Sequence, residues 1–226
     1  KKMVNDFLKI SKYESFWLSL RNNFILNGII NESPDYILEY SYEEIHEITN
    51  VLSKVIDSKS EFTKFHSTEL SKKAKIIAQY YNFNKEKTNQ FLIATDLHDL
   101  GKLAIPNSIL DKPGKLTNEE FTKIKSHSFY TRKALESIDG FEKITEWASN
   151  HHEKNDGSGY PYGLTNIDLD FPSQIIMVLD IYQAIRENRP YRNSMSHNKA
   201  IKIIFEMADN GKLNLEIAKD INKIFK

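Results

Sequence analysis

Apolar residues recur every three or four positions along nearly the whole chain, and this spacing is the strongest constraint on its fold. The clearest examples are the segments 43–56, 88–100, 119–138 and 173–185. Such spacing is typical of one face of an α-helix, and no run of strict alternation is long enough to predict a sheet. In LTNEEF, Thr117 followed by Glu120 predicts a helix N-cap with a capping box. We therefore expect an all-α fold with a few ordered loops.

The length of 226 residues suffices for one large domain, or for a domain with a helical extension. Residues 1–45 carry none of the polar clusters described below. We expect them to form an N-terminal helical lead-in to a main domain over residues 46–226. The alternative is that they are simply the first helices of the same bundle.

The charge balance and the absence of cysteine exclude several classes of function. Lysine plus arginine and aspartate plus glutamate each number 31, so the formal net charge is zero and predicts no bulk nucleic acid or anionic membrane as partner. Without cysteine there is no disulfide and no cysteine zinc site. No apolar run approaches the roughly 20 residues that span a bilayer, and no signal peptide is visible. We expect a cytoplasmic protein.

Histidine and aspartate residues are distributed as one small group per expected helix. They are His66, His98 with Asp99, His127, His151 with His152, and Asp180. In a helical bundle such residues can point inward to one site. Imidazoles mixed with carboxylates suit iron, manganese or zinc, and seven ligands suit two ions with a bridging carboxylate. The order and spacing together predict a metal centre.

Each of these residues taken alone is a weak signal. A single helical histidine is more often a core or surface residue than a ligand, and Asp180 could equally be an ion-pair partner inside its apolar helix. A helical scaffold with chance polar residues is therefore the simplest alternative. His46 and His197 lie outside the pattern, and we expect both to be solvated, with His197 near a helix start.

The chain resembles the HD-GYP phosphodiesterases, a branch of the HD metal-dependent phosphohydrolases. The resemblance covers residues 45–210 and is carried by IDSKSEFTKFHS (56–67), LHDLGKLAIPNSILDKPGKLTNEEF (97–121), KSHS (125–128), HHEKNDGSGYPYGL (151–164), VLDIYQAI (178–185) and RPYR (189–192). It implies an HD-type helical bundle around a centre of two or three metal ions, commonly iron or manganese, with zinc, nickel or magnesium as further candidates.

The resemblance also implies an activity, the hydrolysis of the bacterial second messenger cyclic di-GMP to linear pGpG, with a possible second cut to GMP. Two alternatives stay open. One is a phosphodiesterase for another cyclic dinucleotide, such as cyclic GMP-AMP. The other is a catalytically silent domain that binds nucleotide or metal and signals through partners. An upstream sensor domain and a homodimer are expected partners.

Residue roles follow from the resemblance by position. The metal ligands would be His66, His98, Asp99, His127, His151, His152 and Asp180, with Asp99 as the bridge. Lys102 would contact a phosphate beside the metal ions, so Asp99 and Lys102 are the expected catalytic residues. The expected substrate contacts are Lys102, the name-giving loop Gly159, Tyr160 and Pro161, and the basic residues Arg189 and Arg192. Arginine can hold a phosphate bidentately, and tyrosine can stack on a guanine.

Two departures from the family pattern concern the metals. The glutamate that holds a third metal in some members is replaced by Phe62, with Glu61 one residue off, which predicts a binuclear centre. Gln183 stands where the family has a second acid. If that acid orients a ligand, its loss should weaken metal binding about 10- to 100-fold.

Two further departures lie near the site. Ser128 and Thr131 replace the proline and glycine of the family's H-P-x-x-G, and we expect Thr131 to narrow the close packing beside His127. Asn188 stands where an acid is usual.

Glu153 and Asp156 are expected to orient ligands and shape the loop without binding metal.

Overall fold

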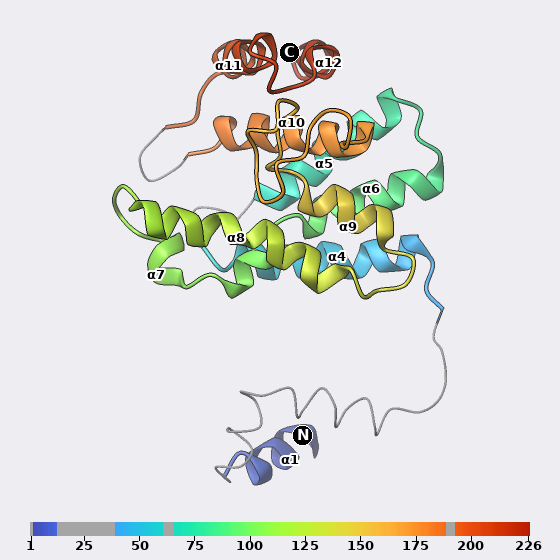
Figure 1. The fold of residues 1–226 in the computed structure, drawn as a ribbon. Coiled ribbons are helices and arrows are strands. Elements are labelled where there is room, and N and C mark those ends of the chain that lie inside the picture. Colours follow the sequence, from blue (N-terminus) through green and yellow to red (C-terminus); the bar gives the residue numbers. More distant parts are fainter. Residues whose placement is uncertain (1, 13–38, 61–65, 189–192) are drawn as a thin grey trace. The chain divides into compact units, whose positions relative to one another are not determined.

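The computed structural model describes residues 2–12, 39–60, 66–188 and 193–226 (Figure 1). The chain divides into two compact units, Lys1–Glu39 and Tyr40–Lys226. The described part of the first unit is the helix α1 (Lys2–Ile10) and the turn after it. The domain boundary expected after residue 45 stays a prediction.

The named elements of the second unit are all helices, joined by turns and loops. Its elements are α4 (Tyr42–Asp57), α5 (His66–Tyr80), α6 (Lys85–Leu97), the 3-10 helix η1 (Leu100–Ala104), α7 (Asn107–Leu110), α8 (Asn118–Leu135), α9 (Glu142–Ser149), α10 (Phe171–Arg186), α11 (His197–Asp209) and α12 (Leu215–Ile224). In the described ranges the only β-type pairing is an isolated bridge between Asp156 and Thr165. The predicted all-α class is confirmed. None of the described helices combines the length and hydropathy needed to cross a membrane.

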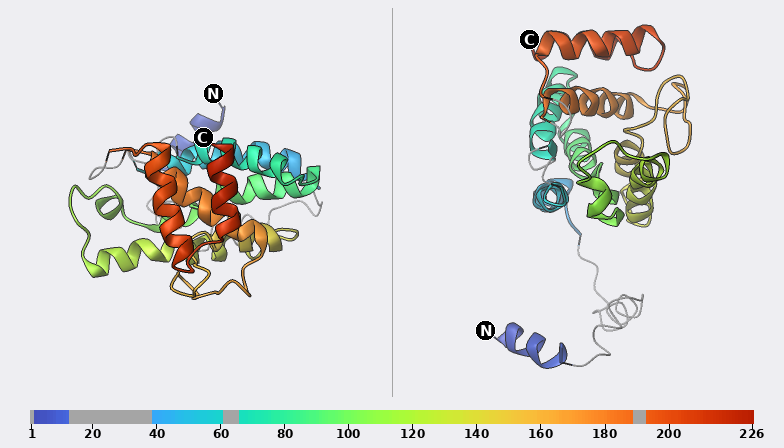
Figure 2. Two further views of the ribbon diagram at one scale, coloured as in Figure 1. Left: turned by 90° about the horizontal axis from the view of Figure 1, so that it is seen from above. Right: turned by 90° about the vertical axis from the view of Figure 1, so that its left-hand side faces the viewer.

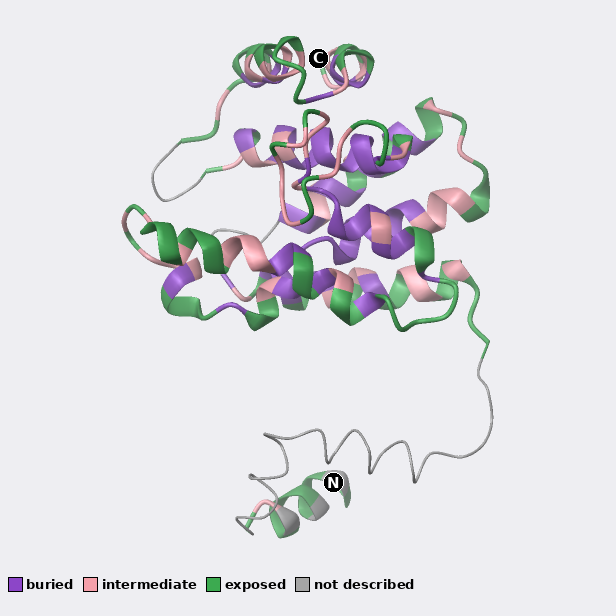
Figure 3. Cartoon of the chain, viewed as in Figure 1, coloured by how far each residue is buried: buried purple, intermediate pink, exposed green. Residues whose placement is uncertain are grey.

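The helices of the second unit pack in layers around α6 and α10 (Figure 2). The helix α6 packs against α4, α5 and α9, while α10 packs against α5, α9, α11 and α12. Both are mostly buried (Figure 3), and residues 175–179 of α10 are completely inaccessible. A helix that is apolar on all sides belongs in the middle of a bundle. This arrangement places the ends of α6 and α9 beside the middle of α8 and α10.

Local sequence signals fix where several helices begin. Thr117 accepts a hydrogen bond from the backbone N–H of Glu120, whose carboxylate accepts one from the backbone of Thr117, so the predicted capping box is present. Asp170 caps α10 by accepting from Ser173 N, and its other oxygen accepts from Trp147 Nε1 at 2.7 Å. The second bond ties the start of α10 to α9, which carries residues of the site at its end.

Candidate metal centre

The structure brings the seven expected metal ligands together from five helices or their ends. They are His66 at the start of α5, His98 and Asp99 just after α6, His127 within α8, His151 and His152 just after α9, and Asp180 within α10. They form three overlapping groups, in each of which the ligand atoms lie within 4.8 Å of one another. The groups are His127 with His151 and His152, His66 with His98 and Asp180, and His98 with Asp99 and His151.

Asp99 lies between the two outer groups and presents one carboxylate oxygen to each. Its Oδ2 atom lies 3.2 Å from His98 Nε2. Its Oδ1 atom lies 3.4 Å from His127 Nε2 and 4.0 Å from His151 Nε2. One carboxylate that faces two sets of imidazoles has the arrangement of a bridging ligand between two ions.

Asp180 lies on the other side of the cluster. Its Oδ1 atom is 3.1 Å from His66 Nε2, and its Oδ2 atom is 3.9 Å from His152 Nδ1. The helix around it is apolar, so an isolated carboxylate here would be expensive to bury. Asp180 is therefore placed among polar partners and not among the core side chains of α10.

Backbone carbonyls orient three of the imidazoles. The Nδ1 atoms of His98, His127 and His151 each lie 2.6–2.7 Å from a carbonyl three residues earlier, those of Thr95, Ile124 and Ala148. A carbonyl only accepts, so Nδ1 carries the proton and the Nε2 lone pair faces the cluster. Partners of this kind fix the tautomer of metal-binding histidines.

The two carboxylates of the cluster are ionised near neutral pH. Burial acts to raise the pKa of Asp99, but His98 and Lys102 outweigh it and hold that pKa well below its usual value. Burial is likewise outweighed at Asp180, where the hydrogen bond to His66 keeps the pKa well below the ordinary range. Deprotonated carboxylates are the form that binds metal.

The imidazoles divide into two electrostatic classes. Burial lowers the pKa of His127 and of His151, and it lowers the pKa of His152 to about 3, so all three are neutral. At His66 the opposing effect of burial is exceeded by the carboxylates of Asp180 and Glu187, which raise the pKa to about 9. A metal cation at this second group would displace a proton from His66.

The donor set fits divalent metal ions. The buried Nε2 atom of His98 lies close to Asp99 but lacks hydrogen-bond geometry, so it has no hydrogen-bond partner. Nε2 of His127 and Nε2 of His151 face each other at 3.1 Å. Buried nitrogens directed at one another and at carboxylates are satisfied best by a shared cation.

Glu187, which the sequence analysis did not single out, contacts the ring nitrogen of His66 that does not face Asp180. Its Oε2 atom lies 3.0 Å from His66 Nδ1, and its Oε1 atom accepts a hydrogen bond from Gln183 Nε2 at 2.6 Å. Gln183 therefore acts on His66 through Glu187. The expectation that Gln183 weakens metal binding stays a prediction. A carboxylate that can orient His66, that of Glu187, is nevertheless present.

Replacing Glu187 with alanine should weaken metal affinity about 10- to 100-fold, because His66 would lose the acceptor that orients its ring. Competition between the protein and a chromogenic chelator for Mn²⁺ measures this change. Glu206→Ala, on an exposed position of α11, is the matched control and should leave affinity unchanged. Equal affinity in the Glu187→Ala and wild-type proteins would refute this role.

Lys102 and Tyr160 lie at the edge of the cluster. The Lys102 ammonium forms an ion pair with Oδ2 of Asp99 and is only partly exposed. The Tyr160 ring lies 4.9 Å from the His152 ring, and Lys125 Nζ lies 5.6 Å from the Tyr160 ring centre. A cation beside Asp99 and an aromatic face beside His152 are suited to a phosphate and a base.

The loop that carries Tyr160 is held in place by Glu153. This completely buried carboxylate accepts hydrogen bonds from Tyr162 N at 2.8 Å and Leu164 N at 3.0 Å. A Cβ atom on Gly159 would lie 2.3 Å from Glu153 Cα, so only glycine fits there. Asp156 accepts hydrogen bonds from the backbone and the hydroxyl of Ser158. Both acids shape the loop, as expected, and a role in orienting the metal ligands stays a prediction.

The side chain of Thr131 connects two elements, which differs from the expectation that it narrows the packing beside His127. Its buried hydroxyl accepts a hydrogen bond from Gly101 N at 2.9 Å and donates one to His98 O at 3.0 Å. The side chain thereby joins α8 to the turn that carries His98 and Asp99. A hydroxyl that is satisfied on both sides makes this larger residue compatible with the close approach.

Some expected residues lie outside the described ranges. These are Glu61, Phe62, Arg189 and Arg192. The third-metal position and the basic substrate contacts therefore stay predictions. Asn188, which is described, accepts a hydrogen bond from Ser194 N at 2.8 Å.

His46 and His197 are half-buried and have polar neighbours, so the expectation that both are solvated holds only in part. Nδ1 of His46 lies 3.0 Å from Oδ2 of the completely buried Asp96. His197, the first residue of α11, lies 3.0 Å from the Tyr182 hydroxyl and 3.1 Å from Asn222 Oδ1. A buried acid needs a polar partner, and the sequence did not reveal that Asp96 is buried. Neither histidine belongs to the three ligand groups.

The fold and the clustered histidines and aspartates define a helical metal-binding protein of the HD type, and comparison with known proteins agrees. The HD domain family model matches residues 50–217, so the chain belongs to the HD domain family. A solved HDG"Y"P protein from Bdellovibrio bacteriovorus has the same fold, with a TM-score of 0.61 and 19% identity over 81% of this chain and 63% of that one. The resemblance to the HD-GYP branch is confirmed.

Two curated relatives match nearly the whole chain. A 3'3'-cGAMP-specific phosphodiesterase 1 of Vibrio cholerae is 35% identical over 95% of this chain and 50% of its own length. A cyclic di-GMP phosphodiesterase of Thermotoga maritima is 30% identical over 98% of this chain and 59% of its own length. The chain thus spans between half and three fifths of the length of these relatives.

Proposed function

We propose that the chain is a metal-dependent phosphodiesterase that hydrolyses cyclic di-GMP to linear pGpG. The observation that supports this most is the position of Asp99, whose two carboxylate oxygens face separate groups of imidazoles. Its relatives are named for hydrolysis of cyclic dinucleotides. A location in the cytoplasm, an upstream sensor domain and a second cut to GMP are part of this proposal.

Two metal ions, iron or manganese before zinc, nickel or magnesium, would occupy the cluster. His127, His151 and His152 would hold one ion, His66, His98 and Asp180 the other, and Asp99 would bridge them. When bound, such ions offset the charge of a phosphodiester and lower the pKa of a water molecule.

The remaining residues bind and orient the substrate. Lys102 would contact a phosphate oxygen as a point charge, since its ammonium already lies against Asp99. Tyr160, beside His152, would stack on a guanine together with the loop residues Gly159 and Pro161. Hydrolysis adds one water across a P–O bond, frees a 3′ hydroxyl and leaves a 5′ phosphate.

A second candidate substrate is 3'3'-cGAMP. Two Vibrio cholerae relatives named as specific for it are 35% and 36% identical over 95% and 91% of this chain. The two dinucleotides differ in one base and share the phosphodiester that metal ligands would act on. Both therefore belong in the same assay.

The deciding experiment is a hydrolysis assay on the chain purified without oxygen and loaded with Fe²⁺ or Mn²⁺. We expect a linear dinucleotide from cyclic di-GMP, and the relative rate on 3'3'-cGAMP assigns the preference. If neither substrate is cut while two ions are bound per chain, the phosphodiesterase proposal fails. Binding of nucleotide without turnover would then favour the silent signalling module.

Arg189→Ala should raise KM or lower kcat about 10-fold or more while metal content stays at the wild-type level, because we expect this guanidinium to hold a phosphate. Steady-state kinetics and elemental analysis on the same preparation test both halves. Arg186→Ala is the control for the loss of an arginine, because the Arg186 guanidinium hydrogen-bonds to Met195 O. A loss of metal in Arg189→Ala would assign this residue a structural role.

A further inference from the structure

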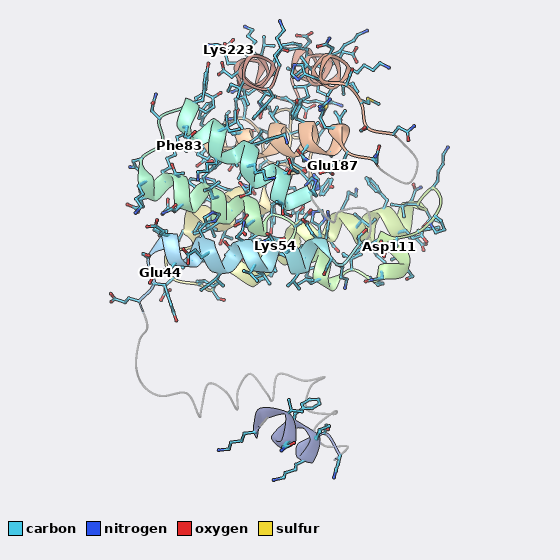
Figure 4. The ribbon with its side chains drawn as sticks, turned by 180° about the vertical axis from the view of Figure 1, so that it is seen from behind. Glu44, Lys54, Phe83, Asp111, Glu187 and Lys223 are labelled. Carbon is cyan, nitrogen blue, oxygen red and sulfur yellow. The ribbon has the colours of Figure 1, made fainter. Side chains whose placement is uncertain are left out.

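The outward face of α4 carries an apolar stripe. Ile48, Val51 and Val55 are 57%, 62% and 53% exposed. Their spacing of three and four residues places them on one side of the helix, while the opposite side packs on α6 and α5. Figure 4 shows α4 at the front of the bundle, with Lys54 on it. Three adjacent exposed aliphatic side chains form a surface that favours a protein partner.

The charges beside this stripe lie on either side of Val51, with Glu47 four residues before it and Lys54 three residues after it. Glu47 precedes Ile48, and Lys54 precedes Val55, so an acid flanks one end of the stripe and a base flanks the other. Both charged residues are exposed, and neither forms an ion pair within the described part of the chain. The stripe is therefore complementary to a copy of itself turned end over end.

We propose that α4 is the contact of a two-fold symmetric homodimer, in which the α4 helices of two copies pair antiparallel. Val51 then meets Val51 of the second copy, Ile48 meets Val55, and Glu47 meets Lys54. The Val51 contact lies on the two-fold axis, and each of the other two contacts occurs twice, as a two-fold interface requires. A parallel pairing would instead place Glu47 and Lys54 of one copy beside Ile48 and Val55 of the other, and the charges would stay unpaired.

The size of the surface sets the expected affinity. The helix α4 has 16 residues, and a single helix face of this length buries less than the roughly 800 Å² per partner of a standard interface. We therefore expect a reversible dimer with a dissociation constant of about 1–100 µM. Sedimentation equilibrium of the whole chain over this concentration range measures it.

Charge reversal tests the pairing itself. Glu47→Lys should set lysine against lysine, Lys54→Glu should set glutamate against glutamate, and each variant alone should dimerise at least about 10-fold more weakly. Mixing the two variants pairs lysine with glutamate at both contacts and should restore dimers. The double variant Glu47→Lys/Lys54→Glu should also dimerise like the wild type.

Controls separate this pairing from unfolding and from a general charge effect. Lys202→Glu, on an exposed position of α11, should leave dimerisation unchanged. Far-UV circular dichroism checks that each variant is folded. If a single variant is unstable, the double variant still provides a folded protein in which the pairing can be tested. A monomeric wild type at about 200 µM, twice the upper expected dissociation constant, would overturn the proposal. Dimers indifferent to both reversals, or a mixture that stays monomeric, would overturn it too.

Discussion

Asp99→Ala protein should retain fewer than one metal ion per chain, where the wild-type chain should retain two. The carboxylate faces His98 with one oxygen and His127 and His151 with the other, so its removal takes a ligand from both ions at once. Elemental analysis after anaerobic reconstitution and desalting gives the metal count directly.

The control is Asp209→Ala, at the exposed end of α11, which should keep both ions. Asp99→Asn refines the comparison because it preserves the shape of the side chain and removes its charge. Two ions retained in Asp99→Ala would mean that Asp99 does not bridge the centre. The ligand assignment would then have to change.

Gly101→Ala should destabilise the protein by about 3 kcal/mol, at the upper end of overpacking effects. A Cβ atom at this position would lie 1.9 Å from His127 O and 2.8 Å from Thr131 N. Both neighbours are backbone atoms of α8, so the helix must move as a whole. Urea denaturation, with the free energy of unfolding extrapolated to zero urea, measures the loss.

The same displacement should reduce metal retention, because it separates His127 from the turn that carries His98 and Asp99. Gly114→Ala is a matched control, since a Cβ atom on Gly114 would meet no other atom within 4 Å and the stability should change by less than about 1 kcal/mol. A Gly101→Ala protein as stable as the wild type would show that α8 can shift at little cost in free energy and that the close contact has no structural role.

The periodic sequence predicted the helical class because apolar spacing is a local property that does not depend on the partner helix. Thr117 and Glu120 predicted a helix start for the same reason, since a capping box closes within four residues. The histidine and aspartate groups could be connected only through their order along successive helices. Their closeness in space then followed from packing that brings α5, α6, α8, α9 and α10 together.

The supporting contacts could not be predicted because they join distant parts of the chain. Glu187 and His66 are 121 residues apart, and nothing near Glu187 indicates a histidine partner. Thr131 looked like an obstacle because its hydrogen bonds to Gly101 and His98 exist only in the folded packing. His46 looked solvated because the burial of Asp96 depends on how α4 lies against α6.

The central claim is a two-metal centre that hydrolyses a cyclic dinucleotide, and a metal titration tests it most directly. Metal-free protein is titrated with Mn²⁺ while the formation of linear product from cyclic di-GMP and from 3'3'-cGAMP is followed. The structure predicts that activity rises to a plateau at two equivalents per chain, since Asp99 lies between two outer groups of three ligands each. A plateau at one equivalent, or no product from either substrate at saturating metal, would contradict it.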